Sequence, residues 1–285
     1  MKRFSLLTCL VLALLTNSVK AAEVDIKPDV VYGHKLGLAM TMDVYTPDET
    51  NGAGVMFMVS GGWYSRWAPP EGRLGFFKSL TDKGFTIFSV RHGSSPKFSI
   101  PEAVSDVRRS VRYIRLNAEE FGIDEDRIGV YGMSAGGHLS LVLGTASDEG
   151  NPNAKDPVLK ISDRVNAVVA FVAPTDLRIM VPEHKDRLPA YARFPALDLE
   201  MKLAAEHSPL VHVSTDDPPT LLIAGDQDTL VPVAHSKNIF AEFQKQKVTS
   251  ELMILEGAGH GFRGEDFTRS IQATTDWFDK HLGKK

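Results

Sequence analysis

The strongest constraint on the fold of this chain is a five-residue motif, G-x-S-x-G, which spans residues 132–136. Residues 127–131 before it predict a short buried strand, and residues 139–144 after it predict an apolar helix. A serine on a sharp turn between a strand and a helix has a strained backbone, and its hydroxyl is exposed above the sheet. Glycines flank it because a Cβ there would crowd the turn. Ser134 is therefore a candidate nucleophile.

The other apolar segments alternate between strand and helix patterns. Residues 24–45 predict two strands, and single strands are predicted at residues 55–59, 85–90, 127–131, 165–171, 220–224 and 251–255. Helices are predicted around residues 76–80, from Pro101 to Phe121, after Ser134, around residues 239–243 and over residues 267–282. This alternation implies right-handed crossovers, so we predict an α/β fold with a mostly parallel central sheet and helices on both faces.

One segment departs from the alternation of strands and helices. Residues 177–215 carry prolines among apolar side chains, and we interpret them as a small helical cap over the site rather than a second domain.

The helix predicted from Pro101 has an apolar stripe at steps of three and four residues. Its arginines lie off that stripe, and we expect a solvated face formed by Arg108, Arg109, Arg112 and Arg115.

The first residues have the layout of a secretory signal peptide. A basic start is followed by an apolar run over residues 4–15 and by small residues that end at Ala21. The run is shorter than the about 20 residues that a spanning helix needs, although an uncleaved anchor is an alternative. We predict a signal peptide over residues 1–21 and a single domain over residues 22–285. Cleavage would remove Cys9, the only cysteine, so we expect no disulfide and no cysteine-ligated metal.

A serine hydroxyl attacks well only when a base takes its proton, so the chain must supply a histidine. His260 lies in a glycine-rich loop directly after the last predicted strand, where ligands bind in sheets of this kind. A carboxylate must also hold the second imidazole nitrogen. Asp226 and Asp228 both follow the strand at residues 220–224. We favour Asp228, which lies farther into the loop, and expect Asp226 to bond to backbone.

The oxyanion that forms on a carbonyl under attack needs backbone N–H donors. We expect one from Ala135 and a second from Gly62 or Trp63, in the glycine-rich loop after the strand at residues 55–59. Trp63, Tyr64 and Trp67 crowd this loop, and they are candidate substrate-binding residues that could stack on a sugar or phenolic ring. Packing of the same rings between cap and sheet is the alternative.

The order Ser134, Asp228, His260 along the chain is that of the α/β-hydrolases. The chain resembles this family from about Val31 onward, most closely esterases of the hormone-sensitive-lipase type and bacterial feruloyl and acetyl xylan esterases. The most specific segments are residues 124–138, 225–232 and 259–262. The resemblance implies that Ser134 is the nucleophile, Asp228 the acid and His260 the base. The family's loop commonly reads His-Gly-Gly-Gly-Trp, whereas residues 59–63 here read Val-Ser-Gly-Gly-Trp and lack the histidine, which leaves the second oxyanion donor open between Gly62 and Trp63.

The sequence thus predicts a secreted or periplasmic serine hydrolase that cleaves carboxylic esters through an acyl-enzyme. Short-chain, acetyl or aromatic acyl esters, including esters on carbohydrate, are the expected substrates, because a short cap broken by prolines would not form a long acyl tunnel. We expect no metal or organic cofactor and no stable membrane insertion after signal removal. The formal net charge of −4 without basic runs argues against a nucleic-acid partner. An amidase, formamidase or peptidase would use the same residues, and a non-catalytic binding protein would be expected to lack one of them.

Export of the protein should leave a mature chain that begins at Ala22. The basic start, apolar run and small residues fit recognition and cleavage after Ala21. Intact-mass measurement of the exported protein should match residues 22–285, with protein made without an export step as the control. An exported product that retains Met1 would contradict this prediction.

Overall fold

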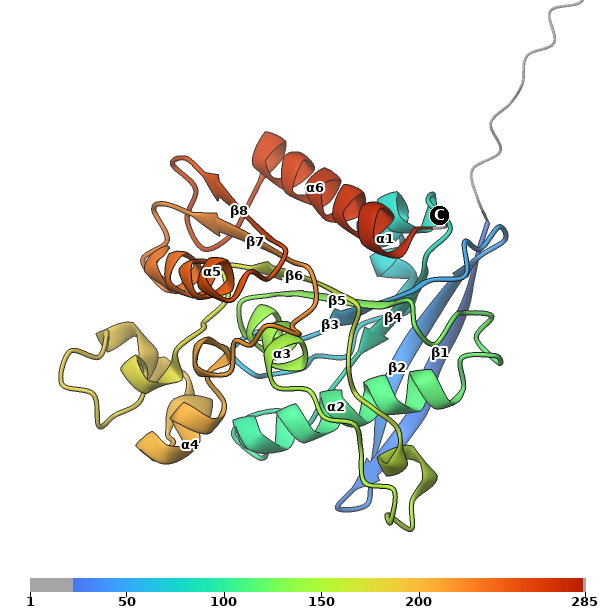
Figure 1. Ribbon diagram of the computed structural model, residues 1–285, viewed down its shortest axis with the longest axis horizontal. Coiled ribbons are helices and arrows are strands. Elements are labelled where there is room, and N and C mark those ends of the chain that lie inside the picture. The colour runs from blue at the N-terminus through green and yellow to red at the C-terminus, as the bar shows by residue number, and fades with distance from the viewer. Residues whose placement is uncertain (1–22, 284–285) are drawn as a thin grey trace, which may run out of the picture.

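One eight-stranded sheet organises the structure, a computed structural model that describes residues 23–283 (Figure 1). The predicted signal peptide lies outside the described residues. The strands are β1 (Val24–Lys35), β2 (Leu38–Pro47), β3 (Gly54–Met58), β4 (Thr86–Val90), β5 (Ile128–Met133), β6 (Ala167–Phe171), β7 (Thr220–Gly225) and β8 (Ser250–Leu255).

The strand order is β1-β2-β4-β3-β5-β6-β7-β8. Strand β2 runs antiparallel to both β1 and β4, and every pairing from β4 onward to β8 is parallel. Strands β4 to β7 are buried almost throughout, as expected of parallel strands covered on both faces. The predicted α/β architecture is confirmed. Since the parallel strands share one direction, their carboxyl ends meet at one edge of the sheet.

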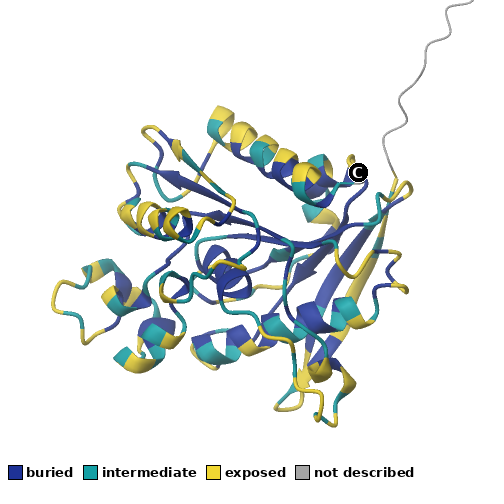
Figure 2. Ribbon diagram, viewed as in Figure 1, coloured by how far each residue is buried: buried dark blue, intermediate teal, exposed yellow. Residues whose placement is uncertain are grey.

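Helices cover both faces of the sheet (Figure 1). Three of them, α2 (Ile100–Leu116), α3 (Ala135–Thr145) and α5 (Ala234–Gln246), share one apolar core with the sheet, and α1 (Leu74–Thr81) and α6 (Gly264–Leu282) share the other. Figure 2 shows the central strands and α3 buried, whereas α2, α5 and α6 are buried on the side that faces the sheet and exposed on the other. The two layers hold the sheet, and therefore its carboxyl edge, in a fixed shape.

Helix α2 begins and ends at side chains that satisfy its terminal backbone groups. Ser99 and Glu102 form a capping box at its start. At its end Asn117 donates to the Tyr113 carbonyl across 2.7 Å. The predicted apolar stripe is buried as expected, but its last member, Phe121, lies in the turns after the helix. The helix is shorter than predicted because Asn117 closes it.

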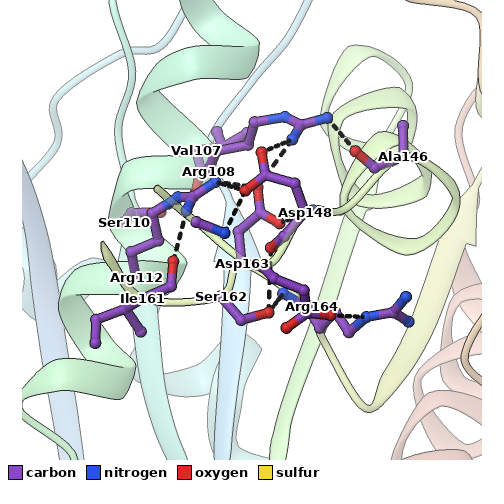
Figure 3. A network of polar contacts seen from close by, with 12 residues as sticks. Val107, Arg108, Ser110, Arg112, Ala146, Asp148, Ile161, Ser162, Asp163 and Arg164 are labelled. Carbon is purple, nitrogen blue, oxygen red and sulfur yellow. Dashed lines mark hydrogen bonds and ion pairs between the residues drawn. The ribbon is translucent and has the colours of Figure 1, made fainter. Parts of the chain in front are cut away.

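The arginines of α2 do not form the solvated face that the sequence suggested. Figure 3 shows Arg108 and Arg112 gathered around Asp148 and Asp163. Arg108 Nη1 lies 3.0 Å from an oxygen of each aspartate, and Arg112 Nη2 lies 2.6 Å from Asp148 and 3.2 Å from Asp163. The Asp163 carboxylate is fully buried, and burial raises its pKa. It needs these partners because an unpaired buried charge costs about 3–5 kcal/mol.

The other two arginines of this helix are also engaged. Arg115 donates across 2.6 Å to the carbonyls of Ser162 and Arg164, and Arg109 pairs with Asp156 across 2.6 Å. Together the four arginines fasten the connection between α3 and β6 to α2. The prediction was wrong because these partners lie 36 to 55 positions farther along the chain, where helical spacing carries no information.

Residues 177–215 form a series of short turns beside α3 and α5 (Figure 1, yellow to orange). They contain four 3-10 turns and one short helix, α4 (Met201–Glu206). Pro189, Pro195 and Pro209 each stand at the start of a turn. Proline favours this position because its φ is fixed and its missing N–H would be unbonded there in any case. Within residues 23–283, no helix has both the length and the apolar character needed to cross a membrane.

Candidate active site

Ser134 occupies the turn between β5 and α3 with φ 55° and ψ −121°, a conformation rare for a residue with a side chain. Two close approaches enforce it. A Cβ on Gly132 would lie 2.5 Å from the backbone of Gly136, and a Cβ on Gly136 would lie 2.7 Å from the Met58 carbonyl oxygen. The Ser134 N–H donates to the Phe171 carbonyl of β6 across 2.8 Å. The serine is thus held at the carboxyl edge of the sheet.

His260 and Asp228 reach Ser134 from the loops that follow β8 and β7. His260 Nε2 lies 2.9 Å from Ser134 Oγ, and His260 Nδ1 lies 2.7 Å from Asp228 Oδ2. In the tautomer that fits these contacts, Nδ1–H donates to Asp228, and Nε2 accepts the serine proton. The structure therefore brings together the three residues that the sequence singled out, in the geometry that proton transfer from the serine requires.

The two aspartates that competed for the role of acid have different partners. The Asp228 carboxylate is fully buried, and its Oδ1 accepts from the N–H groups of Leu230 and Val231, each across 2.9 Å. Oδ2 faces His260. Asp226 instead accepts from the Gly257 N–H across 2.7 Å. It fastens the loop that carries His260 without touching the imidazole.

Among the residues that the structure describes, the loop after β3 brings two with unbonded backbone N–H groups to the cavity at Ser134. Gly61 and Tyr64 exchange two backbone hydrogen bonds of 3.0 Å, and the two residues between them, Gly62 and Trp63, have φ of 58° and 57°. Within residues 23–283, the N–H groups of Gly62, Trp63 and Ala135 donate to no other backbone carbonyl. Gly62 and Trp63 line the cavity at Ser134. All three expected oxyanion donors are therefore present, and both candidates for the second donor remain suitable.

The three aromatic residues of this loop are placed differently from one another. Trp63 is only 3% exposed, and its indole N–H donates to His138 Nδ1 across 3.2 Å. It has no open ring face on which a sugar could stack, so its predicted stacking role does not fit its burial. Tyr64 is 50% and Trp67 56% exposed, and neither lines the cavity at Ser134. Their rings are exposed to solvent, so they are accessible to any part of a substrate that extends out of the cavity.

A small apolar cavity adjoins Ser134. Its volume is about 10 Å³, close to the space that one water molecule needs. The Phe194 ring packs so closely on the donor loop that a Cβ on Gly62 would lie 2.7 Å from it. Burial raises the pKa of Tyr191 to about 12, so its phenol stays neutral. The sequence did not identify the residues that line this cavity, although the apolar residues among the prolines of the cap were a signal for them. The apolar lining residues are Pro174, Met180, Tyr191, Phe194, Leu197, Leu230 and Val231.

No group of three or more His, Cys, Asp or Glu side chains is placed to hold a metal ion among the described residues. The Ser134 hydroxyl, hydrogen-bonded to the imidazole of His260 and through it to the buried carboxylate of Asp228, suits acyl transfer to serine, with backbone N–H groups of the Gly62–Trp63 turn at the cavity beside the serine.

Comparison with protein families supports this conclusion. The profile of the BD-FAE family matches residues 42–243, well over half of the chain. The chain belongs to the BD-FAE family. It is similar to the esterase LipC of Mycobacterium tuberculosis, with 29% identity over 79% of this chain and 57% of LipC. It is also similar to LipM of the same organism, a probable carboxylic ester hydrolase, with 27% identity over 76% of this chain and 51% of LipM. The chain thus spans little more than half the length of these two relatives.

Solved structures place this BD-FAE chain in the α/β-hydrolase fold. A truncated carbohydrate esterase from gut microbiota is similar with a TM-score of 0.76 and 26% identity, over 92% of this chain and 97% of that one. Esterase 2 of Thermogutta terrifontis, solved as the adduct with paraoxon, has a TM-score of 0.71 and 22% identity over 93% and 96% of the two chains. At that identity the second match shows the fold alone.

The different partners of the two aspartates predict different effects of the same substitution. Asp228→Asn should lower kcat by roughly 10⁴-fold, because an amide N–H facing Nδ1 favours the wrong imidazole tautomer. Asp226→Asn is the matched control and should keep most of the activity, since its amide oxygen can still accept from Gly257. Steady-state kinetics and thermal unfolding of both variants check this. A larger kcat loss in Asp226→Asn would assign the acid role to Asp226.

Proposed function

We propose that this BD-FAE protein is a serine esterase that cleaves carboxylic esters through an acyl-enzyme. The observation that carries the proposal is the continuous hydrogen-bonded series Ser134–His260–Asp228, with contacts of 2.9 Å and 2.7 Å, beside free backbone N–H groups. The similarity to proteins described as esterases supports it.

The residues would divide the reaction as follows. His260 Nε2 takes the proton of Ser134 Oγ as that oxygen bonds to the ester carbonyl carbon, and the carbonyl electron pair moves onto its oxygen. The N–H of Ala135 and an N–H of the Gly62–Trp63 turn donate to this oxyanion. When the tetrahedral intermediate collapses, the bond to the alcohol oxygen breaks and His260 gives that oxygen its proton. Water then attacks the acyl-serine by the same steps and releases the acid.

We further propose that the acyl group is acetyl. The cavity of about 10 Å³ beside Ser134 has room for a methyl group, which is similar in size to a water molecule. A butyryl chain would have to displace Phe194 or Tyr191, and forcing extra methylenes into a packed site costs about 1–3 kcal/mol. Of the acyl groups expected from the sequence, an aromatic acyl group fits this cavity least.

For the alcohol side we propose a carbohydrate, met outside the cytoplasm. Support comes from the signal-peptide pattern of residues 1–21 and from the similarity to a protein described as a carbohydrate esterase. Exposed Tyr64 and Trp67 adjoin the oxyanion loop, and an aromatic face with a polar tip suits the mixed apolar and polar surface of a sugar ring.

Ser134→Ala should abolish hydrolysis of every ester, since loss of such a nucleophile lowers kcat on the order of 10⁶-fold.

In the natural protein, kcat/KM should fall from p-nitrophenyl acetate through butyrate to octanoate. Phe194→Ala should enlarge the cavity and move the preference toward butyrate, with Leu116→Ala, an exposed residue at the end of α2, as the control. A rise of kcat/KM toward octanoate in the natural protein would refute the acetyl preference, and residual turnover in Ser134→Ala would refute the nucleophile.

The carbohydrate proposal makes a separate prediction for Trp67. Trp67→Ala should raise KM for acetylated xylo-oligosaccharides by roughly tenfold, equivalent to about 1.4 kcal/mol of lost binding. KM for p-nitrophenyl acetate should stay the same, because this small ester leaves the exposed ring unused. Equal effects on both substrates would mean that Trp67 supports the loop rather than the sugar.

A further inference from the structure

His138 lies one helical turn after Ser134 and joins three parts of the site. Its backbone N–H donates to the Ser134 carbonyl across 2.9 Å. Its Nδ1 accepts the indole N–H of Trp63 across 3.2 Å, and its Nε2 lies 2.7 Å from the carbonyl oxygen of His207, at the end of α4. One imidazole therefore contacts the oxyanion loop and the cap, from the helix that carries the nucleophile.

The surroundings of this imidazole fix its protonation state and tautomer. The side chain is fully buried, and burial lowers its pKa to about 4. It is therefore neutral at pH values above about 5. Since the carbonyl of His207 can only accept, Nε2 carries the proton and Nδ1 has a lone pair for Trp63. Both ring nitrogens are satisfied in this one arrangement.

The oxyanion loop needs such support. Trp63 has φ 57°, and a non-glycine residue in the left-handed region is strained. Contacts from two sides hold it there. The Trp63 carbonyl accepts from the Ser95 N–H across 3.0 Å, and the ring of Trp63 meets that of His138 edge to face at 5.4 Å between centroids. Without an acceptor at Nδ1 the buried indole N–H would lose its partner, and the loop would be free to relax.

We propose that His138 is a positioning residue, which holds the Gly62–Trp63 turn so that its N–H groups face the developing oxyanion. The inference rests on the proposed ester hydrolysis at Ser134. His138 does not touch the reacting atoms; it acts through Trp63 on one side and connects the cap to the same loop through His207 on the other. The loss of this support should affect the transition state, in which the oxyanion forms, more than the binding of the ester.

The test is a set of variants that separates the two hydrogen bonds of the ring. His138→Phe keeps a ring and removes both bonds; kcat should fall by roughly 100-fold, near the lower end of the loss seen when one oxyanion donor is removed, with KM unchanged. His138→Asn places an amide oxygen near the position of Nδ1 and should recover most of kcat. His138→Gln places its amide nitrogen near Nε2 and should not. His34→Phe, at an exposed histidine on β1, is the matched control.

Trp63→Phe removes the donor of the same bond and provides a double-mutant cycle. The kcat of the Trp63→Phe, His138→Phe variant should equal that of either single variant, because each single variant already removes the Trp63–His138 hydrogen bond on which the inference makes kcat depend. A full kcat in His138→Phe, a change in KM alone, or losses that multiply in the double variant would each overturn the inference. If His138→Phe does not fold, the comparison of His138→Asn with His138→Gln decides, and equal kcat values in these two would count against it.

Two different kinetic outcomes distinguish a failure of this inference from a failure of the proposed function. Loss of turnover in Ser134→Ala together with full kcat in His138→Phe would leave the esterase proposal intact and refute the role of His138. Turnover in Ser134→Ala would refute the esterase mechanism itself.

Discussion

Helix α3 starts in direct contact with β5, which precedes it, and with β3. Only glycine at position 132 leaves room for the first contact, and only glycine at position 136 leaves room for the second. Every residue of α3 is buried, so the helix cannot move away to relieve the crowding. The chain between them must turn sharply, and Ser134 takes a backbone conformation that costs about 1–3 kcal/mol. As a result its hydroxyl lies at the carboxyl edge of the sheet, where the loops that follow other parallel strands can reach it. His260 after β8 and Asp228 after β7 are in that position.

The charge distribution around this turn is simple. The buried Asp228 carboxylate is satisfied by two N–H groups of its own loop and by His260. Burial lowers the pKa values of His138 and His235 to about 4 and raises that of Tyr191 to about 12. These three groups therefore stay neutral across the physiological pH range. The Asp228 carboxylate lies 2.7 Å from Nδ1 of His260 and holds the imidazole in the tautomer whose Nε2 faces Ser134.

Much of the fold and of the site could be predicted from the sequence, because both depend on local patterns. Strand and helix periodicities gave the architecture, and the three polar residues at strand ends met where the parallel strands end. The sequence could not predict the partners of Arg108 or Arg112, since these aspartates are close only in the folded chain. For the same reason the sequence left open whether Trp63 is exposed to a substrate or packed between cap and sheet. An aromatic residue in a glycine-rich loop suggests exposure, and its acceptor, His138, lies 75 positions away.

In the acetyl preference that we propose, the cap would limit the acyl group by packing rather than by charge. Each methylene that a longer chain buried would contribute about 0.8 kcal/mol. The same methylene would have to displace side chains that already fill the space, at about 1–3 kcal/mol. Phe194 is the hardest to move, because its ring packs directly on Gly62 of the oxyanion loop. A chain that pushed Phe194 aside would disturb the backbone that must bind the oxyanion. The residue that we propose limits acyl length therefore packs on a proposed donor to the oxyanion, so we expect a longer acyl chain to lower the reaction rate as well as the binding affinity.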